Sequence, residues 1–357
     1  MDFSIASILA LDGLTNGAIY GLLALALVLV FAVTRAIFIP QGEFVAYGAL
    51  TLAMLRNGNA VGSVWQDLGD LPGTVWLLLA LALIVAVLDL LQLRTRGLPL
   101  STGLRDTART LAMPVLVLLV CWFGGPRDWP LWAQSVLTLA IVTPLGPLIY
   151  RLAYEKVADA TVLVLLIVSV GVHFAMTGIG LVFFGAEGFR NPPFWEVRFS
   201  IGPIMLSGQT IIIFAASLVL IAALALFFER TLRGKALRAT AVNRLGARLM
   251  GISSAGAGRL SFSLAAFIGA LSGLLIGPTT TIFYDSGFLI GLKGFVAAIF
   301  GGLASYPLAA IGAVFVGLLE SFSSFYASAF KEVIVFTLIL PVLLWRSFQH
   351  GHEDEEE

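Results

Sequence analysis

Three ionisable side chains of this sequence, Glu43, Lys293 and Glu320, fall within or at the start of long apolar runs. Ionisable residues in membrane-spanning segments are rare, pair with one another, and mark the path of a substrate or an ion. Lys293 and Glu320 fall at matching depths in consecutive apolar segments, so we expect them to form an ion pair that is structural or lines a pathway. The alternative for Lys293 is that its long stem carries the ammonium to the membrane surface.

Other polar side chains leave two interpretations open. Asn16 and Tyr20 are four residues apart and share one face of a helix. They could line a path, or they could hydrogen-bond a neighbouring helix, which is worth about 0.6 kcal/mol on average. Glu43 begins an apolar segment, where the helix N-terminus favours a carboxylate by about 0.3–1 kcal/mol, so a helix-end role and a pathway role are equally supported. We expect His173 to form a hydrogen bond between helices rather than a proton relay.

Motifs for catalysis and nucleotide hydrolysis are absent from the sequence. None of the three histidines lies in an HExxH motif, and neither GxSxG nor GxxxxGK[ST] occurs. The single cysteine, Cys121, cannot form an intrachain disulfide. The formal net charge of zero implies no nucleic-acid partner. We therefore expect no enzyme active site, no cofactor and no metal site.

The elements that must position these residues are membrane helices. Hydrophobic residues make up 59% of the chain and charged residues 12%, against about 25% charged residues in soluble domains. Apolar runs long enough to cross a bilayer predict an all-α, polytopic transmembrane helix bundle of about eleven spans, with a range of nine to eleven. The segments that we expect are 14–34, 38–55, 75–93, 110–124, 131–150, 161–184, 204–228, 260–283, 289–303, 307–325 and 332–348.

The distribution of basic residues predicts the orientation of the bundle. Fifteen of the 21 Lys and Arg residues fall in one set of alternate connections and five in the other. Because cytoplasmic loops carry the excess of positive charge, we expect the N-terminus outside and the C-terminus in the cytoplasm. We expect one transmembrane domain over residues 1–350, a cytoplasmic loop at 229–259 and a solvated acidic tail at 351–357.

Residues 236–260 form a basic segment that differs from the apolar runs around it. The segment is rich in arginine, has no acidic residue and contains four glycines, at 246, 251, 256 and 258. We expect a helix over 239–250 that ends at Gly251, because glycine is the usual residue after a helix C-terminus. Small residues such as Ala241 and Gly246 would let a partner approach closely. Alternatively, the arginines only fix the topology.

The stretch RATAVNRLGARLMGI at 238–252 resembles the segment through which branched-chain amino-acid ABC permeases contact their ATPases. The matching positions are Arg238, Ala239, Ala241, Ala247, Leu249, Gly251 and Ile252, and the first six are the expected contact residues. Residues 16–31, 41–50, 291–321 and 330–344 resemble the same family in the same order. The stretch FIPQGE at 38–43 departs from the family pattern at Phe38 and Pro40, although Gln41, Gly42 and Glu43 fit. Residues 57–130 have no counterpart and are interpreted as an inserted helical hairpin.

This resemblance implies an ABC importer permease subunit in a bacterial inner membrane, with an ABC importer permease fold. It implies three kinds of partner besides the lipid bilayer: a second homologous permease, two cytoplasmic ATPases and a periplasmic solute-binding protein. The implied cargo is a branched-chain amino acid or a related small amino acid, amide or carboxylate. The implied pathway residues are Asn16, Tyr20, Gln41, Glu43, Lys293 and Glu320. The alternative from another class is a secondary transporter or channel that works alone.

Single-cysteine labelling tests the orientation. In a Cys121→Ser background, Arg244→Cys should stay unlabelled by a membrane-impermeant thiol reagent in sealed cells, because residue 244 is expected in the cytoplasm. Glu196→Cys should be labelled, because residue 196 is expected outside. Efficient labelling at position 244 in sealed cells would overturn the predicted topology.

Overall fold

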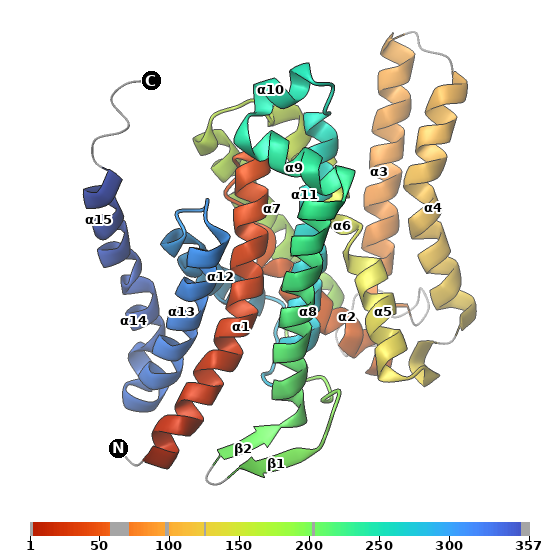
Figure 1. The fold of residues 1–357 in the computed structure, drawn as a ribbon. Helices are drawn as coiled ribbons and strands as arrows, with labels where there is room; N and C mark the ends of the chain where they lie inside the picture. The colour runs from red at the N-terminus through yellow and green to blue at the C-terminus, as the bar shows by residue number, and fades with distance from the viewer. Residues whose placement is uncertain (1–2, 58–70, 97–99, 125, 202–203, 351–357) are drawn as a thin grey trace.

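The computed structural model describes residues 3–57, 71–96, 100–124, 126–201 and 204–350, and these form a helix bundle with one small β-hairpin (Figure 1). The acidic tail and residues 58–70 of the expected insertion lie outside the described residues. The longer helices are α1 (Phe3–Thr34), α2 (Glu43–Asn57), α3 (Gly73–Arg96), α4 (Leu100–Gly124), α5 (Leu131–Val142), α7 (Val162–Phe184), α8 (Gly208–Arg230), α11 (Ser254–Ile276), α12 (Ser286–Phe300) and α13 (Tyr306–Tyr326). The shorter helices are α6 (Leu145–Ile149), α9 (Leu232–Val242), α10 (Arg244–Leu249), α14 (Lys331–Thr337) and α15 (Ile339–His350).

Seven helical segments of the described chain are long and apolar enough to cross a membrane, and two shorter helical stretches, at Thr110–Phe123 and Ser286–Phe300, are also apolar. This establishes a polytopic helical membrane protein. The expected segments 38–55 and 289–303 correspond to α2 and α12, which have 15 residues each. The expected segment 332–348 is divided between α14 and α15. The count of eleven crossings stays a prediction.

The centre of the bundle is α1, which packs against α11, α12 and α13. Small residues allow these helices to approach closely, as in other membrane bundles. A Cβ atom on Gly17 of α1 would meet the backbone of Ala313 and Val314 in α13. A Cβ on Gly273 of α11 would collide with the carbonyl of Val45 in α2. The close approach of α11 to α2 therefore depends on the absence of a side chain at Gly273.

The segment 131–157 is helical but divided. Helix α5 ends at Val142, and α6 follows after Pro144. Proline lacks the N–H that a continuing helix needs and its ring clashes with the preceding turn. The chain then passes through a π-helical turn at Tyr150–Tyr154 before it reaches the connection to α7. Such π turns widen the helix locally and occur often at functional sites.

A short β-hairpin precedes α8, and it corrects the expectation of a purely helical chain. Strand β1 (Arg198–Ile201) pairs antiparallel with β2 (Ile204–Ser207), so the apolar run expected from residue 204 begins as a strand. The side chain of Ser207 accepts the N–H of Thr210 at 3.1 Å and caps α8. The hairpin and the N-terminus of α1 lie at the same end of the bundle (Figure 1).

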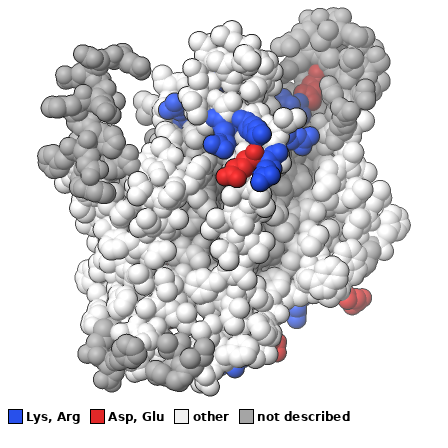
Figure 2. Space-filling model, viewed as in Figure 1, with Lys and Arg blue, Asp and Glu red and all other residues white. Residues whose placement is uncertain are grey.

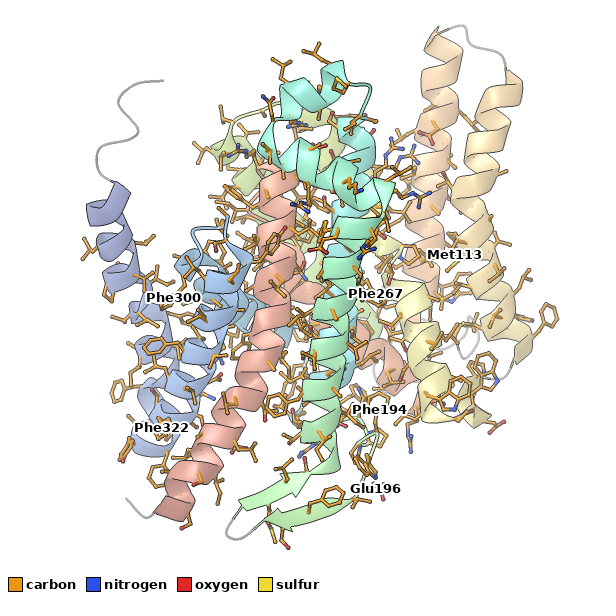
Figure 3. The ribbon with its side chains drawn as sticks, in the orientation of Figure 1. Met113, Phe194, Glu196, Phe267, Phe300 and Phe322 are labelled. Atoms are coloured by element: carbon orange, nitrogen blue, oxygen red, sulfur yellow. The ribbon has the colours of Figure 1, made fainter. Side chains whose placement is uncertain are left out.

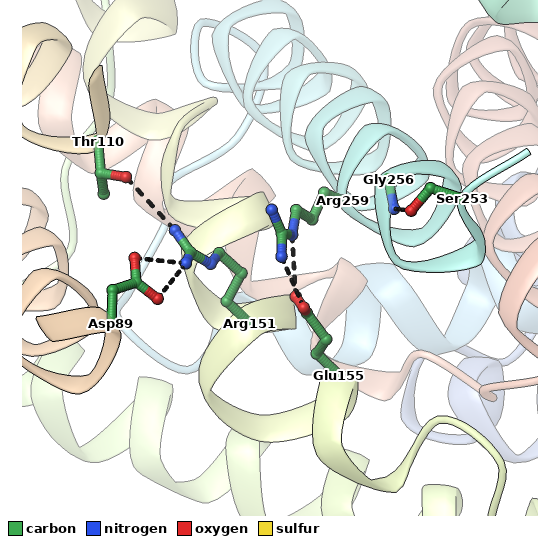
Figure 4. A network of polar contacts seen from close by, with 7 residues as sticks. All are labelled: Asp89, Thr110, Arg151, Glu155, Ser253, Gly256 and Arg259. Atoms are coloured by element: carbon green, nitrogen blue, oxygen red, sulfur yellow. Dashed lines mark hydrogen bonds and ion pairs between the residues drawn. The ribbon is translucent and has the colours of Figure 1, made fainter. Parts of the chain in front are cut away.

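Helices α3 and α4, from the expected insertion, pair with each other at one side of the bundle (Figure 1). An ion pair ties them to the rest of the chain. Both carboxylate oxygens of Asp89 in α3 accept hydrogen bonds from Nη2 of Arg151, at 2.5 and 2.6 Å. The other terminal nitrogen of Arg151 reaches the hydroxyl of Thr110 in α4 (Figure 4). A polar clamp therefore fixes both helices of the hairpin to the π-helical turn.

The packing of α11 on α2 predicts a cost for the smallest substitution at Gly273. Gly273→Ala forces a methyl group against the backbone carbonyl of Val45, and overpacking typically costs about 1–3 kcal/mol. Gly171→Ala in α7 is the matched control, because a Cβ there meets nothing within 4 Å. Thermal unfolding of the purified protein should show a lower midpoint for Gly273→Ala only. Equal midpoints would contradict the close packing of α2 and α11.

Candidate functional site

A cavity of about 1280 Å³, here called the polar cavity, lies near the end of the bundle that holds the N-terminal part of α1 and the β-hairpin. Its walls combine residues of α1, the loop and strand before α8, and helices α12 to α14. Figure 3 shows Glu196, one of the lining residues, beside the strands together with Phe194. The charged lining residues are Asp12, Arg190, Glu196, Arg198, Lys293, Glu320, Lys331 and Glu332.

A buried ionic cluster lies in the wall of the polar cavity. Lys293 Nζ lies 2.5 Å from Oε1 of Glu320 and 3.1 Å from Oε1 of Glu332. The hydroxyl of Tyr20 donates to the second oxygen of Glu320 at 2.5 Å. Lys293 is 5% exposed and Glu320 is 8% exposed. The ion pair expected between Lys293 and Glu320 is confirmed, and it joins α12 to α13, α14 and α1.

The structure brings together four of the six residues expected along a path. Asn16, Tyr20, Lys293 and Glu320 all line the polar cavity. Glu332 completes the cluster, and sequence reasoning missed its contact with Lys293. The sequence did contain a signal for this contact. Glu332 is an acidic residue at the start of an apolar segment, and Lys293 lies in another apolar segment.

Gln41 and Glu43 are not among the residues that line the polar cavity. Gln41 is fully buried and its Nε2 donates to the carbonyl of Ala265 in α11 at 3.0 Å. Glu43 is also fully buried, and its Oε1 lies 3.0 Å from Nδ1 of His173 in α7. His173 thus approaches α2 from α7, but the hydrogen bond expected of it is not formed, because Nδ1 of His173 and both oxygens of Glu43 have no hydrogen-bond partner among the described residues. These contacts give Gln41 and Glu43 a structural role in holding α2, and their pathway role stays a prediction.

The lining of the polar cavity determines which solutes it suits. Its eight charged residues comprise four basic and four acidic side chains. A cavity with balanced charge of both signs can accommodate a zwitterion or an uncharged polar molecule without a large electrostatic penalty. No group of three or more His, Cys, Asp or Glu with the geometry of a metal site occurs among the described residues.

At the opposite end of the bundle, the basic segment folds as two helices rather than one (Figure 1). The expected helix over 239–250 is wrong at Asn243, which is extended and separates α9 from α10. The side chain of Asn243 accepts the N–H of Gly246 at 2.7 Å, and this local bond favours a helix start over continuation. Gly251 has a φ of 81°. Its N–H bonds to the carbonyl of Arg248, so the expected glycine cap is confirmed.

Ionic contacts hold the basic segment on the connection that precedes α7. Nη2 of Arg248 lies 2.7 Å from the carboxylate of Asp159, and this hydrogen bond holds the pKa of the Asp159 carboxyl below its ordinary value. Arg259 at the start of α11 binds both oxygens of Glu155, at 2.9 and 2.6 Å (Figure 4). Because of these ionic contacts, a displacement of α10 would also displace residues 155–159.

The outer face of α10 and its flanks is apolar and exposed. Val242 is 86% exposed, Leu245 69%, Leu249 80% and Met250 83%. We call these four residues the apolar tip. Exposed apolar groups that cluster at one place mark contact sites on proteins. Only Leu249 of the four was among the expected contact residues.

The other expected contact residues divide between the surface and the interior. Arg238, Ala239 and Gly251 are exposed. Ala247 is 5% exposed, and Ala241 packs on a small apolar cluster at the end of α1. A bulky substitution at Ala241 or Ala247 would therefore test the fold of this segment rather than a contact with a partner.

Comparison with known proteins gives a match over nearly the whole chain. Residues 9–343 match the family described as branched-chain amino acid transport system, permease component. The high-affinity branched-chain amino acid transport system permease protein LivH of Escherichia coli K12 is 27% identical over 238 residues, which cover 64% of this chain and 77% of that protein. LivH of Salmonella typhimurium matches with the same values. BraD of Pseudomonas aeruginosa is 28% identical over 221 residues, which cover 60% of this chain and 72% of BraD.

The ionic cluster predicts a strong effect when its cation is removed. Lys293→Met leaves Glu320 and Glu332 without their shared partner, and unpairing a buried charge costs about 3–5 kcal/mol. The midpoint of thermal unfolding should fall markedly, and adding Glu320→Gln should restore part of it. Lys331→Gln is the control, because Lys331 is 3.8 Å from Glu332 with a side chain 40% exposed. An unchanged midpoint in Lys293→Met would contradict a structural ion pair.

Proposed function

We propose a role in solute import for this chain, which belongs to the family of permease components of branched-chain amino acid transport systems. The chain is a permease component of an ABC importer and a multi-pass protein of the inner membrane. The family resemblance carried by residues 238–252 and 291–321 is confirmed.

The proposed cargo is a branched-chain amino acid or another small zwitterion. The observation that carries this proposal is the polar cavity, which is lined by equal numbers of acidic and basic side chains and contains the cluster around Lys293. An α-ammonium and an α-carboxylate can each find an opposite charge there. The curated relatives LivH and BraD are named for branched-chain amino acids, which supports this cargo class. Asn16, Tyr20, Lys293 and Glu320 are the proposed pathway residues, and Gln41 and Glu43 position α2 beside them.

The proposed orientation has the N-terminus and the polar cavity outside, and the basic segment and the C-terminus in the cytoplasm. The excess of basic residues at the end that holds α9 and α10 supports this orientation. The proposed partners are a solute-binding protein over the cavity, a second homologous permease beside the bundle, and two ATPases under the basic segment. The ATPases hydrolyse ATP, and this chain is not a catalyst. A carrier that works alone is disfavoured, because it needs no such exposed cytoplasmic contact.

The apolar tip is the proposed contact with the ATPase. In this mechanism ATP closes the ATPase pair and displaces α10. The displacement passes along α9 to the end of α8, and through the pair of Arg259 and Glu155 to the π-helical turn. Helices that meet across glycine backbones, such as α1 and α13, move as packed units. The bundle thereby opens the polar cavity on one side and closes it on the other.

The inserted hairpin of α3 and α4 has a proposed place at the periphery. No described residue of α3 or α4 lines the polar cavity. Its outer face is apolar and exposed at Leu83, Leu116 and Phe123, which suits contact with lipid. The hairpin is thus proposed to stiffen the bundle through Asp89 and Arg151 rather than to contact the cargo.

Leu245→Asp tests the proposed function. Leu245 is 69% exposed, so the change should leave expression and thermal stability of the chain intact. In the assembled transporter it places a charge in a desolvated apolar contact, and truncations at such contacts cost about 2 kcal/mol or more, roughly a thirtyfold loss of association.

Uptake of radiolabelled leucine should therefore fall at least tenfold, and the ATPase activity should no longer respond to the solute-loaded binding protein. Leu245→Met is the matched control, because it keeps an apolar side chain of similar volume. Normal uptake with Leu245→Asp would mean that the apolar tip is not the site of coupling.

A further inference from the structure

A second, smaller cavity of about 550 Å³ lies between α9 and α11, at the end of the bundle that carries the basic segment. We call it the interfacial pocket. Three residues of α9 line it: Arg233, Ala236 and Leu237. On the other side it is lined by the start of α11, including Ala257 and Arg259. The proposed import mechanism uses the pair of Arg259 and Glu155, but it assigns no ligand to the pocket itself.

The interfacial pocket lies where membrane spans end. The apolar helix α8 reaches Arg230, two residues before α9 begins, and the apolar helix α11 begins at Ser254. Pro147, another lining residue, belongs to the span over 131–157. From the ends of α8 and α11 we infer that the pocket lies near the depth of the lipid headgroups, where phosphate groups and the first carbons of the acyl chains meet.

Two arginines, Arg233 and Arg259, lie at the rim of the interfacial pocket, and in the described part of the chain only Arg259 is paired with an acid. Arg233 is exposed, and no salt bridge to it is found among the described residues. Arg259 uses Nε and Nη2 to bind Glu155, which leaves Nη1 available for another acceptor. Figure 2 shows basic side chains gathered on this face over the end of α8 and α9, with few acidic ones among them. Arginine is the preferred partner of phosphate because its guanidinium can donate two parallel hydrogen bonds.

The floor of the interfacial pocket is apolar. Leu237 is 1% exposed and Ala257 is 6% exposed, and both belong to a small cluster with Leu29 and Val33 of α1. An inorganic anion gains nothing from such a floor, whereas an acyl chain or a glycerol backbone does. Basic pockets between membrane helices, with this combination of charge and apolar wall, bind the headgroups of anionic lipids.

We propose that the interfacial pocket binds an anionic phospholipid, whose phosphate lies between Arg233 and Arg259 and whose chains extend over Leu237 and Ala257. The bound lipid holds α9 against α11. Because α9 leads directly into α10, lipid occupancy sets the position from which the apolar tip meets its partner. The site is distinct from the polar cavity, which lies at the other end of the bundle.

Geometry on α9 supplies matched controls. Arg233, Ala236 and Leu237 share one face of α9, whereas Lys235 and Arg238 lie on the other side at about 100° per residue. Lys235 and Arg238 are exposed and do not line the interfacial pocket. Arg233→Gln and Lys235→Gln therefore change the net charge equally, but only the first alters the pocket. Ala236→Phe fills the pocket without changing the charge.

The experiment measures lipid binding to the purified full-length chain by native mass spectrometry in detergent. The probes are phosphatidylglycerol, phosphatidylcholine and inorganic phosphate. Phosphatidylglycerol should bind wild type and Lys235→Gln equally. Binding should weaken about tenfold in Arg233→Gln, as expected for the loss of one charge-assisted phosphate contact, and also in Ala236→Phe.

Two outcomes would overturn the proposal. Equal loss in Arg233→Gln and Lys235→Gln would show diffuse attraction to surface charge rather than a pocket. Inorganic phosphate that competes fully with phosphatidylglycerol at equal concentration would show a phosphate site without a role for the acyl chains. The proposed lipid site is supported if wild type and Lys235→Gln prefer phosphatidylglycerol over phosphatidylcholine and only Arg233→Gln and Ala236→Phe lose this preference.

Discussion

The need to neutralise a buried ammonium organises one end of this bundle. Lys293 is 5% exposed, so water alone cannot stabilise its charge. Carboxylates from α13 and α14 supply the neutralisation, and Tyr20 of α1 satisfies the remaining oxygen of Glu320. Four helices thereby meet at one cluster. Because that cluster lies in the wall of the polar cavity, the same contacts that stabilise the helix arrangement also present charge to a solute.

Charged side chains are arranged differently at the two ends of the molecule. At the end with the cavity, the acidic and basic residues that line it are equal in number, and the pair of Lys293 and Glu320 is buried. At the other end, Arg248 and Arg259 pair with acids of the connection at 155–159, but the arginines of α9 face outward. Basic residues that face outward can contact lipid headgroups or the cytoplasm. The arginines that are paired with acids hold the basic segment against the bundle. Between the two ends, Gly17 packs against α13 and Gly273 packs against α2, and these close contacts leave the helices little freedom to slide past one another. A conformational change must therefore move packed helices together.

The features that could be predicted from the sequence differ from those that could not in the kind of interaction on which each depends. The pair of Lys293 and Glu320 could be predicted, because a charge buried among membrane helices needs an opposite charge nearby and the sequence offers few. The break between α9 and α10 at Asn243 was missed. A single local hydrogen bond, from the N–H of Gly246 to the side chain of Asn243, separates two helices from one continuous helix. The direction of Ala247 was missed for the same reason, since the break rotates α10 about its axis. The contact of Glu332 with Lys293 was missed because it joins residues that are far apart in the sequence, although an acidic residue beside Lys331 was a signal.

The size and lining of the polar cavity bear on where recognition of the cargo resides. Its volume of about 1280 Å³ exceeds the roughly 300–1,000 Å³ of pockets that enclose small ligands. A small solute in so large a space keeps most of its water and makes few simultaneous contacts. Its acidic and basic groups are also already paired with each other at Lys293, so a solute must compete with internal partners. Tight binding would slow release, whereas weak and distributed contacts favour passage. Selectivity is therefore expected to come from the protein that delivers the solute, and the cavity need only tolerate a zwitterion.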